Sequence, residues 1–184
     1  MRIERDGAAP KLSAAAVVLL LLPSLAGAPA VAAEPTNAAP VLRNQVDAMT
    51  RSALQRAGEG ALRRLQDPEC QQVFSDFRDA EGRLLREKLE VAGQTGAGYL
   101  AGWILFVDGS SARACQSSEN VAVTKPDSSV VFVCARQFRE RVFHDPAWVE
   151  AALIHEELHS LGLGENPPTS LEINERVARR CGRR

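Results

Sequence analysis

The sequence predicts an α+β fold, with helices first, a small β-sheet of about three strands next, and two helices last. An apolar repeat of three and four residues runs through 41–66, which is typical of helices with one buried face. Short runs rich in Val, Ile and Phe follow at 99–107, 121–124 and 130–134. Turn-forming residues bound these runs, which favours strands.

The N-terminal segment, residues 1–33, is predicted to be a signal peptide outside the fold. Basic residues precede an apolar run at 12–22, and small residues follow it, which is the pattern of a cleavable leader. The run is shorter than the roughly 20 residues of a membrane-spanning helix, so we expect no stable membrane span after cleavage. We expect a secreted or periplasmic protein with a linker at 34–40 and a single domain at 41–184.

The charge balance argues against a nucleic-acid-binding protein. The whole chain has a formal charge of −1, and the leader contributes three basic and two acidic side chains, so the remainder has a charge of −2. A slightly acidic domain lacks the positive field that binding to phosphates requires. We therefore expect no nucleic acid among the partners.

The cysteines predict two disulfides. Four cysteines follow the leader, and an even number in an exported chain is typical of paired thiols. Of the three possible pairings we favour Cys115–Cys134, which would link neighbouring strands, together with Cys70–Cys181, which would link the N-terminal helices to the last helix. A zinc site built from these cysteines is disfavoured, because the sequence has no C-x-x-C pair.

Two Asp-Pro pairs, at 67–68 and 145–146, predict helix starts. Asp caps the first turn of a helix, and Pro fits its first position. The second pair begins a helix that we expect to end at residue 161, because Gly162 follows it. A last helix is expected over 171–180, with a hydroxyl residue as its cap.

The helix after 145–146 contains the residues with the clearest chemistry. His155 and His159 are four residues apart, so on a helix both imidazoles lie on one face and reach the same ion. Glu156 follows the first histidine and is placed to act as general base. This H-E-x-x-H pattern is typical of zinc hydrolases. We therefore expect Zn²⁺ bound by the two histidines, with Glu156 as the catalytic residue.

Two histidines do not complete such a site, because catalytic zinc usually takes three protein ligands and a water. The only other histidine, His144, precedes His155 by eleven residues, which is about 16 Å along a helix. The third ligand is therefore expected to be a carboxylate. Glu165 is the first candidate, and Glu172, followed by Glu175, is the alternative.

The stretch from His155 to Glu165 resembles the H-E-x-x-H-x-x-G-x-x-H pattern of the metzincin peptidases. Gly162 stands at the glycine of that pattern and Glu165 at its third ligand. The resemblance implies a zincin-like metallopeptidase. A gluzincin-like arrangement takes its third ligand from a following helix and would use Glu172. The ending Leu-His-Ser-Leu-Gly-Leu-Gly-Glu-Asn-Pro-Pro, with the stretch 70–132, is also similar to uncharacterised exported bacterial metallopeptidases.

We therefore expect a zinc-dependent metallopeptidase that acts on a peptide or protein substrate as a monomer. A strand beside the motif helix, expected at 130–134, would align the substrate by strand addition. Two alternatives stay open. Met1 and Met49 are the only methionines, so the methionine turn of metzincins is absent, which favours a non-catalytic metal-binding or degenerate zincin protein with a partner-binding role. Export alone suggests the other alternative, a zinc amidase acting on cell-wall peptides.

Overall fold

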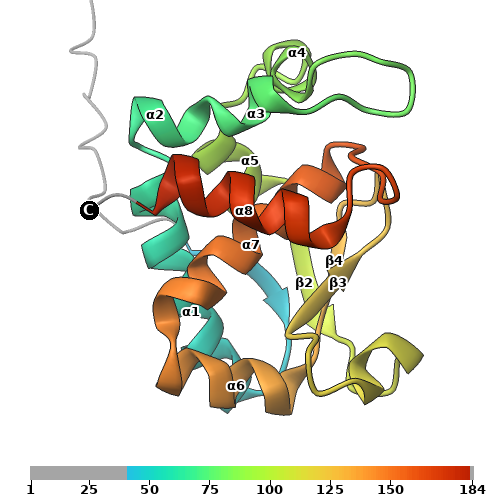
Figure 1. The fold of residues 1–184 in the computed structure, drawn as a ribbon. Coiled ribbons are helices and arrows are strands. Elements are labelled where there is room, and N and C mark those ends of the chain that lie inside the picture. Colours follow the sequence, from blue (N-terminus) through green and yellow to red (C-terminus); the bar gives the residue numbers. More distant parts are fainter. Residues whose placement is uncertain (1–40, 183–184) are drawn as a thin grey trace, which may run out of the picture. The chain divides into compact units, whose positions relative to one another are not determined.

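The computed structural model describes residues 41–182, so the predicted signal peptide and linker lie outside the described residues. This part of the chain is α+β, as predicted, and its sheet has four strands where about three were expected (Figure 1). The strands are β1 (Arg43–Gln45), β2 (Leu105–Asp108), β3 (Ala122–Thr124) and β4 (Val130–Val133). Their order is β1-β2-β4-β3; β3 is antiparallel to β4, and the other neighbours are parallel. Strand β3 is therefore an edge strand.

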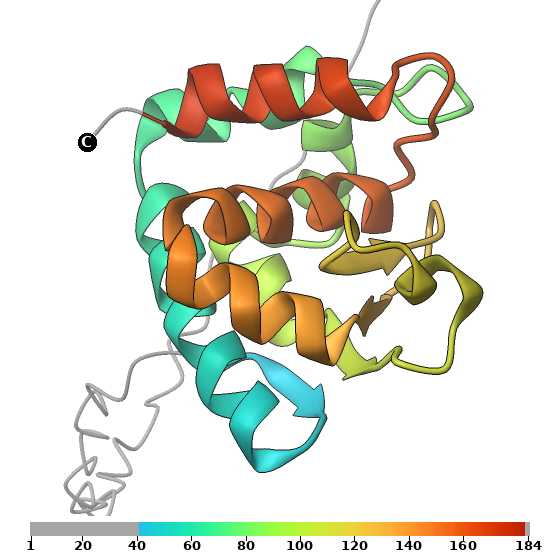
Figure 2. The same cartoon turned by 60° about the horizontal axis from the view of Figure 1, so that its bottom comes forward.

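Helices α1, α6 and α8 pack around α7. The helices are α1 (Ala48–Arg64), α2 (Pro68–Gln71), α3 (Val73–Asp76), α4 (Leu85–Val91), α5 (Gly96–Gly102), α6 (Ala135–His144), α7 (Pro146–Ser160) and α8 (Ser170–Cys181), with a 3₁₀ helix, η1 (Arg113–Gln116). Helix α7 lies between α8 and α6 (Figure 2) and also contacts α1 and β3. Within 41–182, no helix combines the length and the apolar character that crossing a bilayer requires.

Helix α7 begins where the Asp-Pro pair predicted. The Asp145 carboxylate accepts the backbone N–H of Trp148 at 3.1 Å, and Pro146 is the first helical residue. Every residue from Leu153 to Ser160 is buried, the polar ones included. Helices buried on all sides are usually apolar throughout, so each polar side chain here needs its own structural explanation.

Gly162 ends this helix in a turn that only glycine fits. Its φ is +101°, and a Cβ would lie 2.7 Å from a carboxylate oxygen of Asp127, in the β3–β4 turn. The backbone N–H of Asp127 donates to the carbonyl of His159 at 3.0 Å. The end of α7 is thereby held against the β3–β4 turn, and the chain beyond Gly162 turns back over the helix.

The prediction of helical structure throughout 41–66 is wrong at its start. Residues 43–45 form β1, which pairs with β2. Helix α1 begins after Asp47, whose carboxylate accepts the N–H groups of Met49 and Thr50 at 2.9 and 3.1 Å. A three-residue strand owes its stability to its partner strand, which a local sequence pattern does not contain.

Gly60 allows α1 to pass close to α7, and α1 continues through it without a break. A Cβ at Gly60 would lie 2.2 Å from the carboxyl group of Glu150 on α7. Glu150 is buried and accepts the Nε–H of Arg64 at 2.7 Å, in a pair whose side chains are 7% and 8% exposed. The glycine therefore makes room for a buried ion pair between the two helices.

The prediction of one strand over 99–107 is wrong in its first half. Residues 96–102 form α5, because the Thr95 hydroxyl accepts the N–H of Gly98 at 3.1 Å and starts a helix that buries Tyr99 and Leu100. Only Leu105–Asp108 of this region is a strand. A short apolar run is compatible with a buried helix as well as with a buried strand.

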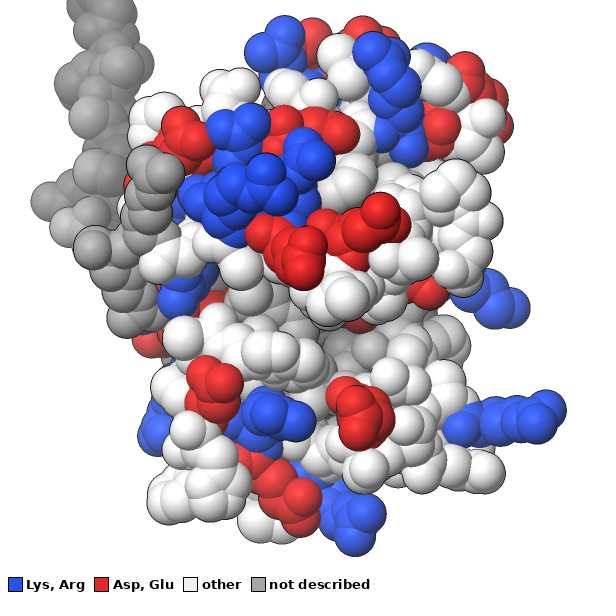
Figure 3. Space-filling view, viewed as in Figure 1, with Lys and Arg blue, Asp and Glu red and all other residues white. Residues whose placement is uncertain are grey.

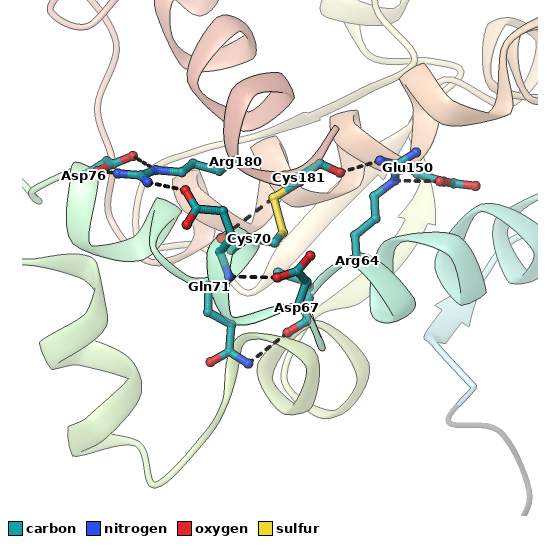
Figure 4. Close-up of a disulfide and its surroundings, with 10 residues drawn as sticks. Arg64, Asp67, Cys70, Gln71, Asp76, Glu150, Arg180 and Cys181 are labelled. Atoms are coloured by element: carbon teal, nitrogen blue, oxygen red, sulfur yellow. Dashed lines mark hydrogen bonds and ion pairs between the residues drawn. A yellow bond between two sulfur atoms is a disulfide. The ribbon is translucent and has the colours of Figure 1, made fainter. Parts of the chain in front are cut away.

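Both predicted disulfides form. Cys70–Cys181 links α2 to the end of α8 across 111 residues of sequence (Figure 4), and closing so long a loop stabilises the fold by about 4–5 kcal/mol in the chain-entropy description. The other bridge differs from expectation in its setting. Cys115 lies in η1 and not in a strand, and it pairs with Cys134 directly after β4.

Ion pairs fix the same end of α8. The Arg180 guanidinium donates to both carboxylate oxygens of Asp76 at 2.8 and 2.9 Å and to Glu69 at 2.6 Å. The hydrogen bond and charge of Arg180 hold the pKa of Asp76 below its usual value. Arg64 donates to the backbone carbonyl of Cys181 (Figure 4). Helix α8 is therefore held in place by α1, α2 and α3.

Replacing Gly60 with Ala tests the close approach of α1 and α7. Alanine favours a helix interior by about 1 kcal/mol over glycine, but here its methyl group displaces a buried ion pair, so we expect a net loss of about 1–3 kcal/mol in the free energy of unfolding. Urea denaturation measures it. Gly102→Ala is the control, because a Cβ there meets no atom within 4 Å. Equal effects of the two changes would contradict the prediction.

Candidate metal centre

Three side chains converge at the C-terminal end of α7. The Nε2 atoms of His155 and His159 are 2.9 Å apart, and Oε1 of Glu165 lies 3.8 and 3.4 Å from them. Among the described residues, these three form the compact group of His, Cys, Asp or Glu side chains that has the geometry to hold an ion. Glu165 reaches the histidines because the chain turns back after Gly162.

Hydrogen bonds fix the orientation of both imidazole rings. His155 Nδ1 lies 2.8 Å from Oδ1 of Asn174 on α8, and His159 Nδ1 lies 2.7 Å from the backbone carbonyl of Leu163. Both partners are acceptors, so each ring carries its proton on Nδ1. Burial, followed by the neighbouring His159, lowers the pKa of His155 to about 4, which leaves that ring neutral. The Nε2 lone pairs then point toward each other, as metal ligands do.

The spacing of these atoms suits a tetrahedral ion. Ligand atoms bound about 2.1 Å from one zinc ion are about 3.4 Å apart. The distances from Glu165 to the two rings, 3.4 and 3.8 Å, agree with this value. The two ring nitrogens, at 2.9 Å, need to separate by about half an ångström. Because two facing lone pairs repel, a cation between His155 and His159 would stabilise the arrangement.

Glu156 lies beside these ligands on the β3 side of α7. Its side chain is 7% exposed, a carboxylate oxygen accepts the backbone N–H of Thr124, and Oε2 has no hydrogen-bond partner. Burial, and then the charge of Glu165, raises the pKa of Glu156 to about 8. Glu156 and the three converging side chains line one cavity of about 410 Å³, which β3 also borders. Glu156 therefore borders the space beside the three converging side chains, with one carboxylate oxygen buried and unpartnered.

Glu172, the alternative third ligand, is engaged elsewhere. Its carboxylate accepts the backbone N–H and the hydroxyl of Thr169 at 2.7 and 2.8 Å, and the Thr169 hydroxyl accepts the N–H of Glu172 in return. This capping box begins α8. Glu175 lies one turn further along and borders a different cavity, between α7 and α8. Neither belongs to the group of His155, His159 and Glu165.

Sequence reasoning missed Asn174. The structure places Oδ1 of Asn174 2.8 Å from Nδ1 of His155. One signal was available: Asn is a poor helix former, and here it occupies a helix interior next to the buried Ile173. A polar side chain at such a position often has a specific partner.

These residues together provide one carboxylate oxygen and two imidazole nitrogens as ligands, with the carboxyl group of Glu156 beside them. Such a set is suited to holding a divalent cation and to moving a proton beside it. Comparison of the chain with protein-family models, curated proteins and solved structures finds no match. The chemistry of this site therefore follows from its own residues.

The third ligand is tested by removing one carboxylate at a time. We expect Glu165→Gln to weaken zinc binding more than about 100-fold, because losing a ligand exceeds the 10–100-fold effect of losing an outer hydrogen-bond partner. Glu172→Gln, which keeps the length and an acceptor oxygen of the side chain, should leave affinity unchanged. Competition with a chromogenic chelator measures both. The reverse result would move the third ligand to α8.

Asn174 is a positioning residue for His155. Its removal should weaken metal binding strongly and change the free energy of unfolding only a little. We expect Asn174→Ala to weaken zinc binding about 10–100-fold and Asn174→Asp, which keeps the acceptor oxygen, to restore it. The free energy of unfolding of the metal-free protein should differ little between the two variants. If Asp fails to restore affinity, the hydrogen bond to Nδ1 is not what positions the ring.

Proposed function

We propose that this chain is an exported zinc-dependent metallopeptidase with a zincin-like arrangement, in which His155, His159 and Glu165 hold the metal. The observation that carries the proposal is the orientation of the two rings: both Nδ1 atoms face acceptors, and both Nε2 atoms face one point beside Glu165. Zinc bound there would supply Lewis acidity and lower the pKa of a coordinated water to about 7.

Glu156 is the proton carrier in this proposal. Glu156 lines the cavity that the ligands border, and the charge of a bound zinc would offset the burial that raises its pKa, so that its ionised carboxylate would accept a proton from the attacking water. Glu156 takes a proton from the water while the oxygen of that water attacks the peptide carbonyl. Glu156 later donates the proton to the nitrogen of the leaving amine. The contact with the Thr124 N–H keeps the carboxylate in place on the β3 side.

Strand β3 is the element that would align an extended substrate. The expected strand 130–134 is wrong for this role, because β4 lies inside the sheet between β2 and β3. Ala122, Val123 and Thr124 of the edge strand β3 border the same cavity as Glu156. A peptide that adds to an exposed strand edge gains main-chain hydrogen bonds whatever its side chains, and here it would lie across the end of α7.

The disulfides support export. Cys70–Cys181 and Cys115–Cys134 include every cysteine of the chain, and disulfides persist mainly in oxidising compartments. A secreted or periplasmic location follows from the same reasoning. The leader at 1–33 would provide the route, and it is a prediction from the sequence alone.

Glu156→Gln separates catalysis from metal binding. We expect this variant to retain zinc and to lose at least about 100-fold in cleavage of casein or of an internally quenched peptide library, since the general base is gone while the ligands remain. His159→Ala should lose both zinc and activity. Zinc content by mass spectrometry and cleavage rates give the two readouts.

The control is Glu140→Gln, which removes a carboxylate from the exposed surface of α6 and should change neither readout. A wild-type protein that binds zinc tightly but cleaves no protein or peptide would favour the non-catalytic metal-binding alternative. A Glu156→Gln variant as active as the wild type would remove Glu156 from the mechanism.

A further inference from the structure

A second cavity lies between α7 and α8, next to the metal centre but outside it. Its volume is about 440 Å³. Its apolar wall consists of Trp148 together with alanines of α7 and α8, namely Ala147, Ala151, Ala152 and Ala178. The small residues leave a space that is long enough for a large side chain.

This cavity continues into the metal centre. An intermediate cavity of about 290 Å³ shares Trp148, Ala152 and Asn174 with it, and shares His155 and Glu156 with the cavity of the metal centre. Ala151 and Ala152 precede Glu156 by five and four residues, about 6–8 Å along the helix. Because an extended peptide advances about 3.3 Å per residue, the cavity is within reach of a side chain one or two residues from a bond held at Glu156.

The polar groups of the cavity make it acidic. Asp145 and Glu175 lie in its lining, and both are exposed. Among the described residues, Arg64 is the one cation in the lining, and it is paired with the buried Glu150. Arg141 covers a face of the Trp148 ring but does not line the cavity. Figure 3 shows acidic groups on both sides of the cleft below α8, with one cluster of basic groups toward the C-terminal end of that helix and further basic groups below the cleft.

We propose that this cavity is a specificity pocket for Lys or Arg, so that the peptidase prefers basic substrates; this rests on the proposed function. The aliphatic stem of the side chain lies along the alanines and Trp148, and the cationic head reaches Asp145 and Glu175 at the mouth. Long basic side chains combine an apolar stem with a charged end, which matches an apolar wall with an acidic rim. Glu156 borders both the intermediate cavity and the cavity of the metal centre, which places the substrate backbone beside this pocket.

Binding of uncleaved peptides tests the pocket separately from catalysis. The probes are blocked alanine-rich hexapeptides with Lys, norleucine or Glu at one position, titrated into the zinc-loaded Glu156→Gln chain and followed by calorimetry. Norleucine keeps the stem and lacks the charge. We expect Lys to bind about 3–10-fold more tightly than norleucine, as partly solvated ion pairs allow, and Glu to bind most weakly. High salt should reduce the preference.

Variants at the mouth of the cavity then test whether the carboxylates there cause the preference for Lys. Asp145→Asn combined with Glu175→Gln should remove the preference for Lys, while Asn still caps α7, and Glu140→Gln on α6 should preserve it. The proposal is overturned if norleucine binds as tightly as Lys, if the preference survives the double change, or if no Lys peptide binds. If peptides are cleaved without charge preference, only the pocket assignment fails. If Lys peptides bind with the expected preference but none is cleaved, only the peptidase assignment fails.

Discussion

The burial of α7 is the constraint on which the rest of the structure depends. The helix is enclosed by α1, α6, α8 and the sheet, yet it carries two histidines and three glutamates in buried positions. Each polar group must find a partner or give up its charge. Glu150 has Arg64, and the histidines have acceptors for their Nδ1 protons. Burial raises the pKa of Glu156 and of Glu157, so charge is tolerated on this helix only where something compensates it.

Helix α8 connects the stability of the fold to the chemistry of the site. The disulfide, the Arg180–Asp76 pair and the Arg64 contact fix its C-terminal end, and Asn174 in its middle holds His155. The position of α8 relative to α7 therefore determines the ring orientation. It also determines the width of the cleft between the two helices. A disulfide between cysteines that are 111 positions apart in sequence thus supports the hydrogen bond between Asn174 and His155.

Sequence patterns a few residues long correctly predicted the features that depend on neighbouring residues alone. The Asp-Pro pair began α7, Gly162 ended it, and a register of four residues placed His155 and His159 on one face. Predictions failed where the deciding contacts are distant in sequence. Strand β1 exists because β2 lies beside it. Residues 96–102 form a helix, although the apolar run that begins at residue 99 was expected to be a strand. The role of Asn174 depends on how α8 packs against α7. The spacing of residues within either helix does not reveal that contact.

The sequence by itself determined that two histidines and a glutamate share one helical turn, because that relation depends only on 3.6 residues per turn. It also narrowed the third ligand to three carboxylates, those of Glu165, Glu172 and Glu175. The tertiary structure decided between their positions: the turn at Gly162 brings Glu165 to the rings, while Thr169 engages Glu172. It decided too that β3, not β4, is the open edge, and that a cavity with an acidic rim adjoins the centre. The edge strand and the cavity arise from packing between separate elements, and the free energy of that packing selects them, whereas the hydrogen bonds between Thr169 and Glu172 are local to the start of α8.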